Sequence, residues 1–362
     1  MTEIPQRNSL VIQTVEILRE RIDHREWSSF LPGERSLSES LQISRPTLRL
    51  ALEVLETEGR IRTERGKRRM IVQRPKVAVS AHPAMVGLVS EDPPHLMAPT
   101  TIFYLNELRR HLQEAGLQLH VFANRKIASR NPQKALASFL EEAHVSCWVL
   151  IAVNEQVQRW FAEKHLPAIV AGSEYPGIRL PSLDLNYAAV CRHAAGVFLR
   201  HGHRRLAILS PDSGIQGDRT SEESFLSAVG ADPGLEASGL AFRHDGTRET
   251  IVRLLNRVFA RKQPPTALLV CRPLHVLTVV TALLNRGLTI PGDFSLISRD
   301  NDTYLNCLHP DIARYTFRRR DFAQRLARLV IQLATTGSLP KREHRLIPQF
   351  HLGATVATRK NP

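Results

Sequence analysis

The sequence predicts an α/β protein in two parts: a small N-terminal winged helix-turn-helix domain and a larger domain built from two doubly wound parallel sheets. The first part is indicated by residues 31–72, which read as two short helices, a tight turn and a two-stranded wing. The second is indicated by short apolar strands that alternate with helices of about 10–15 residues from residue 85 onward. This alternation begins again near residue 187, which predicts two similar lobes.

Residues 74–83 separate the two parts. They hold two prolines and several small residues, and they show no clear helical or strand periodicity. Such a composition is typical of a linker. A chain of 362 residues is too long for one typical domain and suits two or three. The predicted boundaries are therefore 1–75 for the first domain, 76–84 for the linker and 85–357 for the second domain.

A helix that begins at Ser44 is the centre of the first domain. Ser44 is a good N-cap, and Pro46 falls in the first turn, where its missing N–H costs nothing. An apolar stripe follows at helical spacing, formed by Leu48, Leu52 and Leu55. A first helix over residues 8–25 can cover this stripe. Arg45 and Arg49 lie on a different face, as a helix that enters the major groove of DNA requires.

The predicted wing consists of two short strands, 61–63 and 70–72, joined by a turn with Arg65-Gly66-Lys67 at its tip. Gly66 allows a tight turn and a close approach to a sugar–phosphate backbone. Six basic residues and one acid stand between Arg60 and Arg69. Such a run by itself is equally typical of a solvated surface. Beside a helix-turn-helix pattern it favours nucleic acid.

This stretch resembles the winged helix-turn-helix of the GntR family of bacterial repressors. The matching pieces are Leu31-Pro32-x-Glu34-Arg35, Ser44-Arg45-x-Thr47-Leu48-Arg49, Leu55-Glu56-x-Glu58-Gly59 and the Gly66 wing. The resemblance implies that Arg35, Arg45, Arg49 and Gly66 contact double-stranded operator DNA, and we expect Ser44, Thr47 and Lys67 at the same interface. Pro46 departs from the family, which more often has threonine or a small residue there, and it removes a possible phosphate contact.

Net charge, apolar runs and cysteine spacing say less about function than these motifs do. The net charge of +14 favours polyanion partners, but residues 1–75 hold 14 basic and 11 acidic residues, so only +3 of it lies in the DNA-binding part. The sequence has no apolar run of 18 residues and no signal-peptide pattern, which predicts a cytoplasmic protein without a membrane partner. The cysteines are widely spaced, which predicts reduced thiols: Cys147, Cys191, Cys271 and Cys307.

The second domain is predicted from its alternating elements. Strands are expected over 85–89, 117–122, 147–152, 168–171, 206–209, 240–242, 267–270 and 295–298. Helices are expected over 101–115, 132–143, 155–164, 187–200, 222–229, 247–260 and 274–286. Ligands of such sheets bind beyond the carboxyl ends of the strands. Two facing lobes therefore predict a cleft that closes like a hinge.

Several segments of this domain resemble the sensor domain of LacI/GalR-type regulators. They are Pro181-Ser-Leu-Asp184, Gly202-His203-Arg204-Arg205-Leu206-Ala207, Pro264-Pro265-Thr266-Ala267 and the stretch from Gly287 to Asp300. The resemblance covers about residues 85–355 and implies a periplasmic-binding-protein-like fold, a side-by-side homodimer and a small polar effector such as a sugar. It places residues 85–180 and 315–337 in lobe one, and 185–300 with a final strand near 345–355 in lobe two. The combination of parts resembles arabinose-responsive repressors of bacteria.

The resemblance also points to effector-binding residues. Asp300 matches the family's effector-binding aspartate, which would hold sugar hydroxyls; a cap of a hinge loop is the alternative. Arg272 stands where the family has an Asn/Asp pair, and it favours either an anionic ligand or a surface salt bridge. The family arginine near Phe225 is matched loosely by Arg219 or replaced by Ser221. Tyr104 and Trp148 are candidates for an aromatic stacking wall.

Four functions were weighed. A ligand-responsive repressor fits both resemblances. A fusion to a pyridoxal-phosphate aminotransferase would need a Schiff-base lysine in a small-residue setting, which none of Lys126, Lys134, Lys164 and Lys262 has. A transporter's solute-binding protein would carry a signal peptide. A sensor that has lost its ligand and acts through protein contacts is the remaining alternative. We expect a regulator, not an enzyme, with no catalytic residues, no metal and no cofactor.

Overall fold

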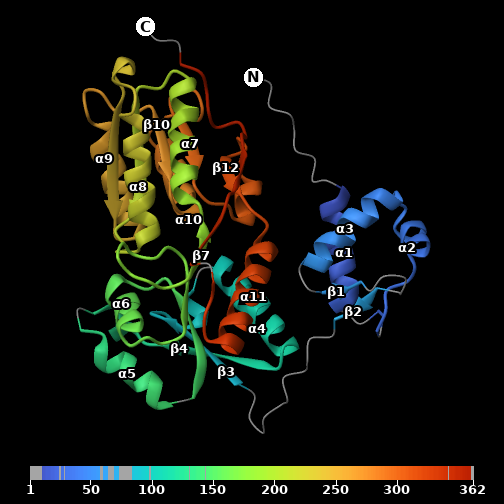
Figure 1. The fold of residues 1–362 in the computed structure, drawn as a ribbon. Helices are drawn as coiled ribbons and strands as arrows, with labels where there is room; N and C mark the ends of the chain where they lie inside the picture. The colour runs from blue at the N-terminus through green and yellow to red at the C-terminus, as the bar shows by residue number, and fades with distance from the viewer. Residues whose placement is uncertain are drawn as a thin grey trace. The chain divides into compact units, whose positions relative to one another are not determined.

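The computed structural model describes residues 10–23, 26–27, 29–57, 60–63, 69–72, 84–97, 99–129, 131–142, 144–340 and 342–359. It divides into two compact units, Met1–Ala78 and Val79–Pro362 (Figure 1). The predicted linker lies outside the described residues except for Ala84, where strand β3 begins.

The first unit is a winged helix-turn-helix, as predicted. It contains α1 (Leu10–Asp23), α2 (Glu34–Leu41), α3 (Arg45–Thr57), β1 (Ile61–Arg62) and β2 (Met70–Ile71). The two strands pair antiparallel, with Ile61 opposite Ile71. The predicted leucine stripe of α3 is buried against Val15 and Leu18 of α1. Gly59 of the family motif and the wing tip with Gly66 and Lys67 lie outside the described residues.

The turn between α2 and α3 follows from its residues. Gln42 ends α2 in the left-handed conformation, with φ of 53°. The Ser44 hydroxyl then accepts a hydrogen bond from the backbone N–H of Thr47 at 3.3 Å, which confirms the predicted N-cap. Pro46 lies in the first turn of α3, where no N–H is needed. The turn therefore fixes where α3 begins, and with it the positions of Arg45 and Arg49 on the helix.

The second unit contains a first lobe with a six-stranded sheet. Its strands are β3 (Ala84–Ser90), β4 (Leu117–Ala123), β5 (Val145–Ile151), β6 (Ala168–Ala171), β7 (Ser182–Leu185) and β13 (Glu343–Leu346). The order is β13-β7-β6-β5-β3-β4, and every pair is parallel. Helices α4 (Pro99–Glu114) and α11 (Arg319–Thr336) cover one face. Helices α5 (Gln133–Glu142) and α6 (Glu155–Glu163) cover the other.

The second lobe repeats this plan. Its strands are β8 (Arg205–Pro211), β9 (Ser238–His244), β10 (Ala267–Val270), β11 (Ser295–Ser298), β12 (Ala313–Thr316) and β14 (Gln349–His351). The order is β14-β12-β11-β10-β8-β9, with β14 antiparallel to β12 and the other pairs parallel. Helices α7 (Tyr187–Arg200) and α8 (Gln216–Val229) cover one face, and α9 (Arg248–Phe259) and α10 (Pro273–Leu284) the other. Short 3₁₀ helices lie at Pro94–Leu96, Arg125–Ala128, Pro233–Leu235 and Thr303–Cys307.

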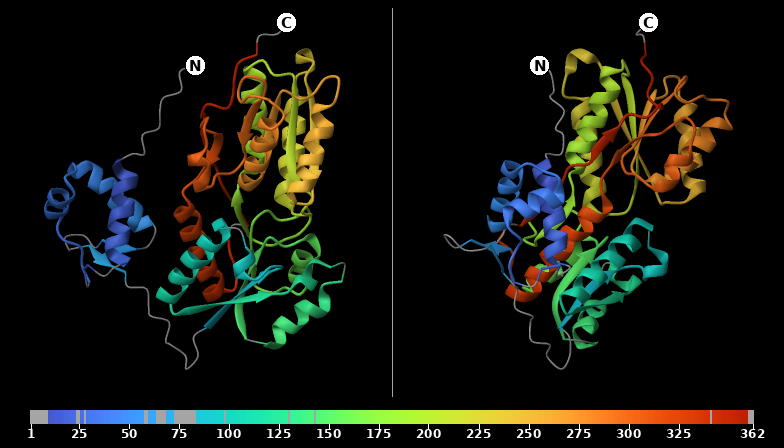
Figure 2. Two further views of the ribbon diagram at one scale, coloured as in Figure 1. Left: turned by 180° about the vertical axis from the view of Figure 1, so that it is seen from behind. Right: turned by 90° about the vertical axis from the view of Figure 1, so that its right-hand side faces the viewer.

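The chain crosses between the lobes three times, after β7, after β12 and after β13 (Figures 1 and 2). The predicted bounds are off by about two residues at two of these crossings, and the predicted final strand of the second lobe is present as β14. Residues 315–316 belong to β12 in the second lobe, and residues 345–346 belong to β13 in the first. The return of α11 to the first lobe agrees with the prediction. Strands β7, β12 and β13 were not predicted because each is short and carries buried polar residues (Asp184, Arg314 and His344) that interrupt the apolar pattern.

Helices cover both faces of each sheet, so the central strands are apolar on both sides. All four residues of β10 are buried, and the neighbouring β8 and β11 also lie in the core. Three of the four free cysteines are buried, and Cys307 is exposed. Within the described part of the chain, no helix is both long enough and apolar enough to span a membrane.

Candidate functional site

The first candidate surface is the N-terminal end of α3. Arg45 is exposed there, and Arg49 has 63% of its side chain exposed. Arg35, on α2, is 80% exposed and pairs with Glu39 at 3.0 Å. Exposed guanidiniums at the start of a helix can contact phosphates or base edges. The hydroxyls of Ser44 and Thr47 lie 2.7 Å apart in the same turn.

Glu34 connects this surface to the base of the wing. One carboxylate oxygen, Oε2, accepts a hydrogen bond from Arg49 Nε at 2.9 Å. The other, Oε1, accepts one from Arg69 Nη1 at 2.7 Å. The hydrogen bonds from Arg69 and then from Arg49 lower the pKa of Glu34 below its usual value. No role of Glu34 was predicted from the sequence, although Glu34 stands in the motif that contains Arg35.

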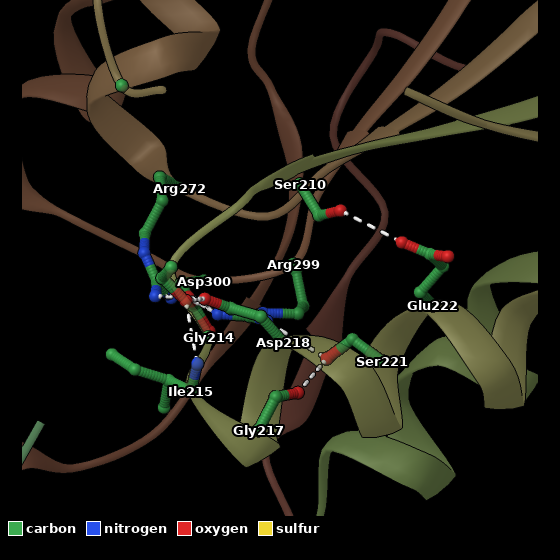
Figure 3. A network of polar contacts seen from close by, with 12 residues as sticks. Ser210, Gly214, Ile215, Gly217, Asp218, Ser221, Glu222, Arg272, Arg299 and Asp300 are labelled. Atoms are coloured by element: carbon green, nitrogen blue, oxygen red, sulfur yellow. Dashed lines mark hydrogen bonds and ion pairs between the residues drawn. The ribbon is translucent and has the colours of Figure 1, made fainter. Parts of the chain in front are cut away.

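The second candidate site lies at the carboxyl ends of the strands of the second lobe. Arg272 follows β10, Arg299 and Asp300 follow β11, and Asp218 lies in the first turn of α8 (Figure 3). Arg272 Nη2 contacts Asp218 Oδ2 at 2.7 Å, and Arg299 Nη1 contacts Asp218 Oδ1 at 2.9 Å. Arg299 Nη2 contacts Asp300 Oδ2 at 2.7 Å. We call these four residues, Asp218, Arg272, Arg299 and Asp300, the charged cluster.

Arg299 is the most buried member of the charged cluster, with none of its side chain exposed. Its Nη1 also donates to Ser221 Oγ at 2.9 Å, and its guanidinium lies over the Tyr187 ring, 4.1 Å from the centroid. Burial opposes the charge of Arg299, but Asp300 and its other neighbours hold its pKa well above the usual value. Burial would likewise raise the pKa of Asp218, but Arg272 and Arg299 outweigh that effect and lower it.

The first lobe contributes aromatic and acidic side chains near this site. Tyr175 donates a hydrogen bond to the backbone oxygen of Gly214 in the second lobe, so the lobes are in contact. Burial, and then the charge of Asp300, raise the pKa of Tyr104, so its phenol stays protonated. Asp184 accepts hydrogen bonds from Ser173 Oγ at 2.5 Å and from the Leu185 N–H at 2.7 Å. Burial raises the pKa of Asp184 to about 6.

The structure brings some of the predicted effector-binding residues together and leaves others apart. Arg272 and Asp300 come together in the charged cluster, with Arg272 Nη1 at 3.8 Å from Asp300 Oδ2. Arg219 is exposed and lies over the Tyr175 ring, 5.8 Å from its centroid. Of the two alternatives near Phe225, Ser221 is therefore the one that contacts the charged cluster.

Trp148 is not a stacking wall, which corrects the prediction. Only 2% of it is exposed, and it packs in the core of the first lobe against Phe122 and Phe161. A Cβ added to Gly87 on the neighbouring strand would lie 2.5 Å from Trp148 Cε3. The ring therefore fills the space that the glycine leaves and points into the core.

Asp218, Arg299 and Tyr187 were not predicted from the sequence. Arg299 stands next to the predicted Asp300, and this adjacency was the only available signal. Asp218 is 81 residues away from Arg299 in the sequence, so only the fold shows that they meet. Among the described residues, no group of three or more His, Cys, Asp or Glu side chains is arranged to hold a metal ion.

Both predicted resemblances match known families. Residues 10–71 match the family described as bacterial regulatory proteins, gntR family, and residues 195–356 match the periplasmic binding protein-like domain. Similar curated proteins include the probable HTH-type transcriptional regulator EndR of Paenibacillus polymyxa, which is 23% identical over 49% of this chain and 53% of its own length. The HTH-type transcriptional regulator AglR of Rhizobium meliloti is 28% identical over 38% of each chain. The chain thus spans about half or less of the length of these relatives.

Solved structures share the fold. A putative transcriptional regulator from Yersinia pestis has a TM-score of 0.67 and 18% identity, and the match covers 76% of this chain and 99% of that one. A structure described as a transcriptional regulator CelR–cellobiose complex has a TM-score of 0.64 and 17% identity, and the match covers 87% of this chain and 92% of that one. At these identities the likeness shows the fold alone.

Proposed function

We propose that this chain, which joins a GntR-type helix-turn-helix domain to a periplasmic-binding-protein-like domain, is a transcriptional regulator controlled by a small molecule. The observation that carries the proposal is the exposed, arginine-bearing start of α3 in a helix-turn-helix unit. The second unit adds a polar site at the carboxyl ends of parallel strands, where ligands of such folds bind.

Operator DNA is the proposed partner of the first unit. Arg45 and Arg49 enter the major groove from the start of α3, and Arg35 approaches from α2. Ser44 and Thr47 lie in the turn at the start of α3, and we propose that their hydroxyls contact phosphate. For Gly66 and Lys67 the proposal rests on the sequence pattern of the wing.

A small polar effector is the proposed ligand of the second unit. Asp300 and Arg272 would contact it from the second lobe, with Tyr104 supplying a phenol from the first and Arg219 at the margin beside Tyr175. A sugar is the favoured class. The matched solved structures include one titled as a complex with cellobiose and one titled with bound ribose, and we extend that ligand class to this chain as a proposal.

Repression, dimerisation and a cytoplasmic location complete the proposal. Two of the curated relatives are described as repressors, one of them as a probable repressor. A helix-turn-helix gains affinity when a dimer places two recognition helices about one turn of DNA apart. We therefore propose a homodimer that releases or binds its operator as the lobes of the second unit change their contacts on effector binding.

Selection of binding sites from random double-stranded DNA tests the proposal directly. The full chain should enrich a two-fold symmetric sequence, and a neutral sugar from a screened panel should change its affinity for that sequence. The regulator proposal is refuted if the chain enriches no sequence. The effector part alone is refuted if it enriches an operator whose affinity no small molecule changes.

A further inference from the structure

We propose that Arg299 is the specificity-determining residue of the sensor site: it supplies the cation of that site from within the chain and so restricts the effector to uncharged molecules. The inference rests on the proposed function, because it concerns the same site between the lobes. It goes further because it proposes that one buried side chain, Arg299, selects the charge of the effector. This side chain keeps its position when the effector binds.

The surroundings of the Arg299 guanidinium are those that proteins use to bind a guanidinium ligand. Nε and Nη2 donate to Asp300 Oδ2 at 3.3 Å and 2.7 Å, and Nη1 donates to Asp218 Oδ1 at 2.9 Å. The face of the cation lies on the Tyr187 ring. Two carboxylates and an aromatic face select a planar cation. Here the chain itself provides that cation, and none of its side chain is exposed.

The positive and negative charges of the charged cluster are also equal in number. Two guanidiniums, Arg272 and Arg299, face two carboxylates, Asp218 and Asp300. An anionic effector would have to draw Arg272 away from Asp218 and leave a buried carboxylate with less compensation. A cationic effector would meet the guanidinium of Arg299. Burying a charge without a partner is unfavourable, so an effector without net charge disturbs the charged cluster least.

One hydrogen-bonding atom of the charged cluster remains for such an effector. Among the residues that the structure describes, Asp300 Oδ1 is buried and has no hydrogen-bond partner, whereas Asp300 Oδ2 is held by Arg299. A carboxylate oxygen only accepts, so its partner must donate. A hydroxyl donates without bringing a charge.

Arg299 therefore orients Asp300 so that one carboxylate oxygen is neutralised and the other is presented to a neutral donor. This geometry favours hydroxyl-bearing molecules over sugar acids or sugar phosphates and thereby decides between the two sequence-based interpretations of Arg272.

Truncation of Arg299 in the full chain tests the role of its guanidinium. Arg299→Ala removes one of the two guanidiniums and leaves two acids beside an aromatic ring with only Arg272 to balance them, so the variant should gain a site for methylguanidinium. We expect its melting temperature to lie roughly 5–10 °C below that of the parent. Methylguanidinium at ten times its dissociation constant should raise that temperature by about 3 °C. The parent should show no such rise at the same concentration, and sodium chloride at equal ionic strength should not replace the guanidinium.

Two further variants control for a nonspecific cavity. Arg299→Ala combined with Asp218→Asn keeps the space but removes one carboxylate, so methylguanidinium should lose at least tenfold in affinity. Arg299→Lys keeps the charge and should not respond to methylguanidinium. If Arg299→Ala does not fold, Arg299→Gln answers the same question, because two carboxylates then share the single guanidinium of Arg272, and the stability of the variant relative to the parent should rise as the pH falls from 7 to 5.

The proposal is overturned by any of three results: Arg299→Ala as stable as the parent and unresponsive to methylguanidinium, an equal response of the double variant, or a pH dependence of Arg299→Gln that parallels the parent. A stabilisation of the parent by acetate or inorganic phosphate that disappears in Arg272→Ala would overturn the restriction to uncharged ligands. These measurements need neither DNA nor effector. Their failure is therefore distinct from a failure of the regulator proposal, which the operator experiment decides.

Discussion

Glu34 of α2 and Arg49 of α3 are joined by a hydrogen bond of 2.9 Å between Oε2 and Nε. The same carboxylate holds Arg69 through its other oxygen, so one acid fixes an arginine on α3 and another beside β2. Arg49 is mostly exposed, and an exposed arginine samples many rotamers unless a partner restricts it. Glu34 therefore acts as a positioning residue for the proposed DNA contact.

We predict that Glu34→Gln lowers specificity more than affinity. Operator binding should weaken about three- to tenfold, while binding to random DNA should stay equal or increase, because a negative charge is lost. Fluorescence anisotropy with both DNAs at one salt concentration measures this ratio. Glu155→Gln, which disrupts an exposed pair with Arg159 in the second unit, is the matched control and should change neither value. An unchanged ratio in Glu34→Gln would show that Arg49 needs no positioning.

The arginines of α3 should carry sequence discrimination. Arg45→Ala and Arg49→Ala are each expected to weaken operator binding by roughly 1–3 kcal/mol and to relax the preference at the base they face. Arg248→Ala removes the same charge from an exposed pair in the second unit and serves as the control. Titrations of operator and of operator mutants give both quantities. Parent-like binding by both α3 variants would refute the recognition-helix assignment.

The wing is expected to contribute a different kind of contact. Lys67→Ala should weaken binding to all sequences alike and should reduce the slope of log affinity against log salt by about one, as expected for one lost phosphate contact. Anisotropy titrations at four or more salt concentrations measure the slope. A loss confined to the operator, with an unchanged slope, would mean that Lys67 reads a base and does not contact the backbone.

The sequence was sufficient for the domain types and for most elements, since the strands of both sheets alternate with amphipathic helices. It failed where the fold depends on distant contacts. Strands β7 and β13 pair with each other within the first lobe although they are far apart in the sequence, and Arg314 within β12 gives no strand signal. The charged cluster was likewise only partly predictable from the sequence. Asp300 was predicted from the family resemblance, but nothing local shows that Asp218 compensates Arg299.

Asp184 should make stability depend on pH. Burial raises its folded-state pKa to about 6, from 3.8 for an isolated aspartate, so the folded state binds the proton more tightly than the unfolded state. Its contribution is therefore most favourable below pH 4 and is lost as the pH rises towards 6, by an amount on the order of 3 kcal/mol. Asp184→Asn should remove this dependence and stabilise the second unit at pH 7–8. Urea titrations at pH 5 and 7.5 measure it; an asparagine variant less stable at both would contradict the assignment.

The last prediction concerns the switch between ligand and DNA. Asp300→Asn keeps the shape of the side chain but removes the charge that Arg299 neutralises and replaces an acceptor oxygen. The first unit does not contain this residue, so operator affinity without ligand should stay within about twofold of the parent. The response to an effector should be lost, because the donor from the ligand no longer meets a carboxylate. Linkage requires that effector and operator change each other's affinity by one common factor, typically about 5- to 150-fold. In the parent, measuring effector affinity with and without operator, and operator affinity with and without effector, gives that factor twice; the variant is measured in the same way. A variant that still responds at the parent's effector concentration would remove Asp300 from the site, and two unequal factors in the parent would show that the two ligands are not coupled through one equilibrium.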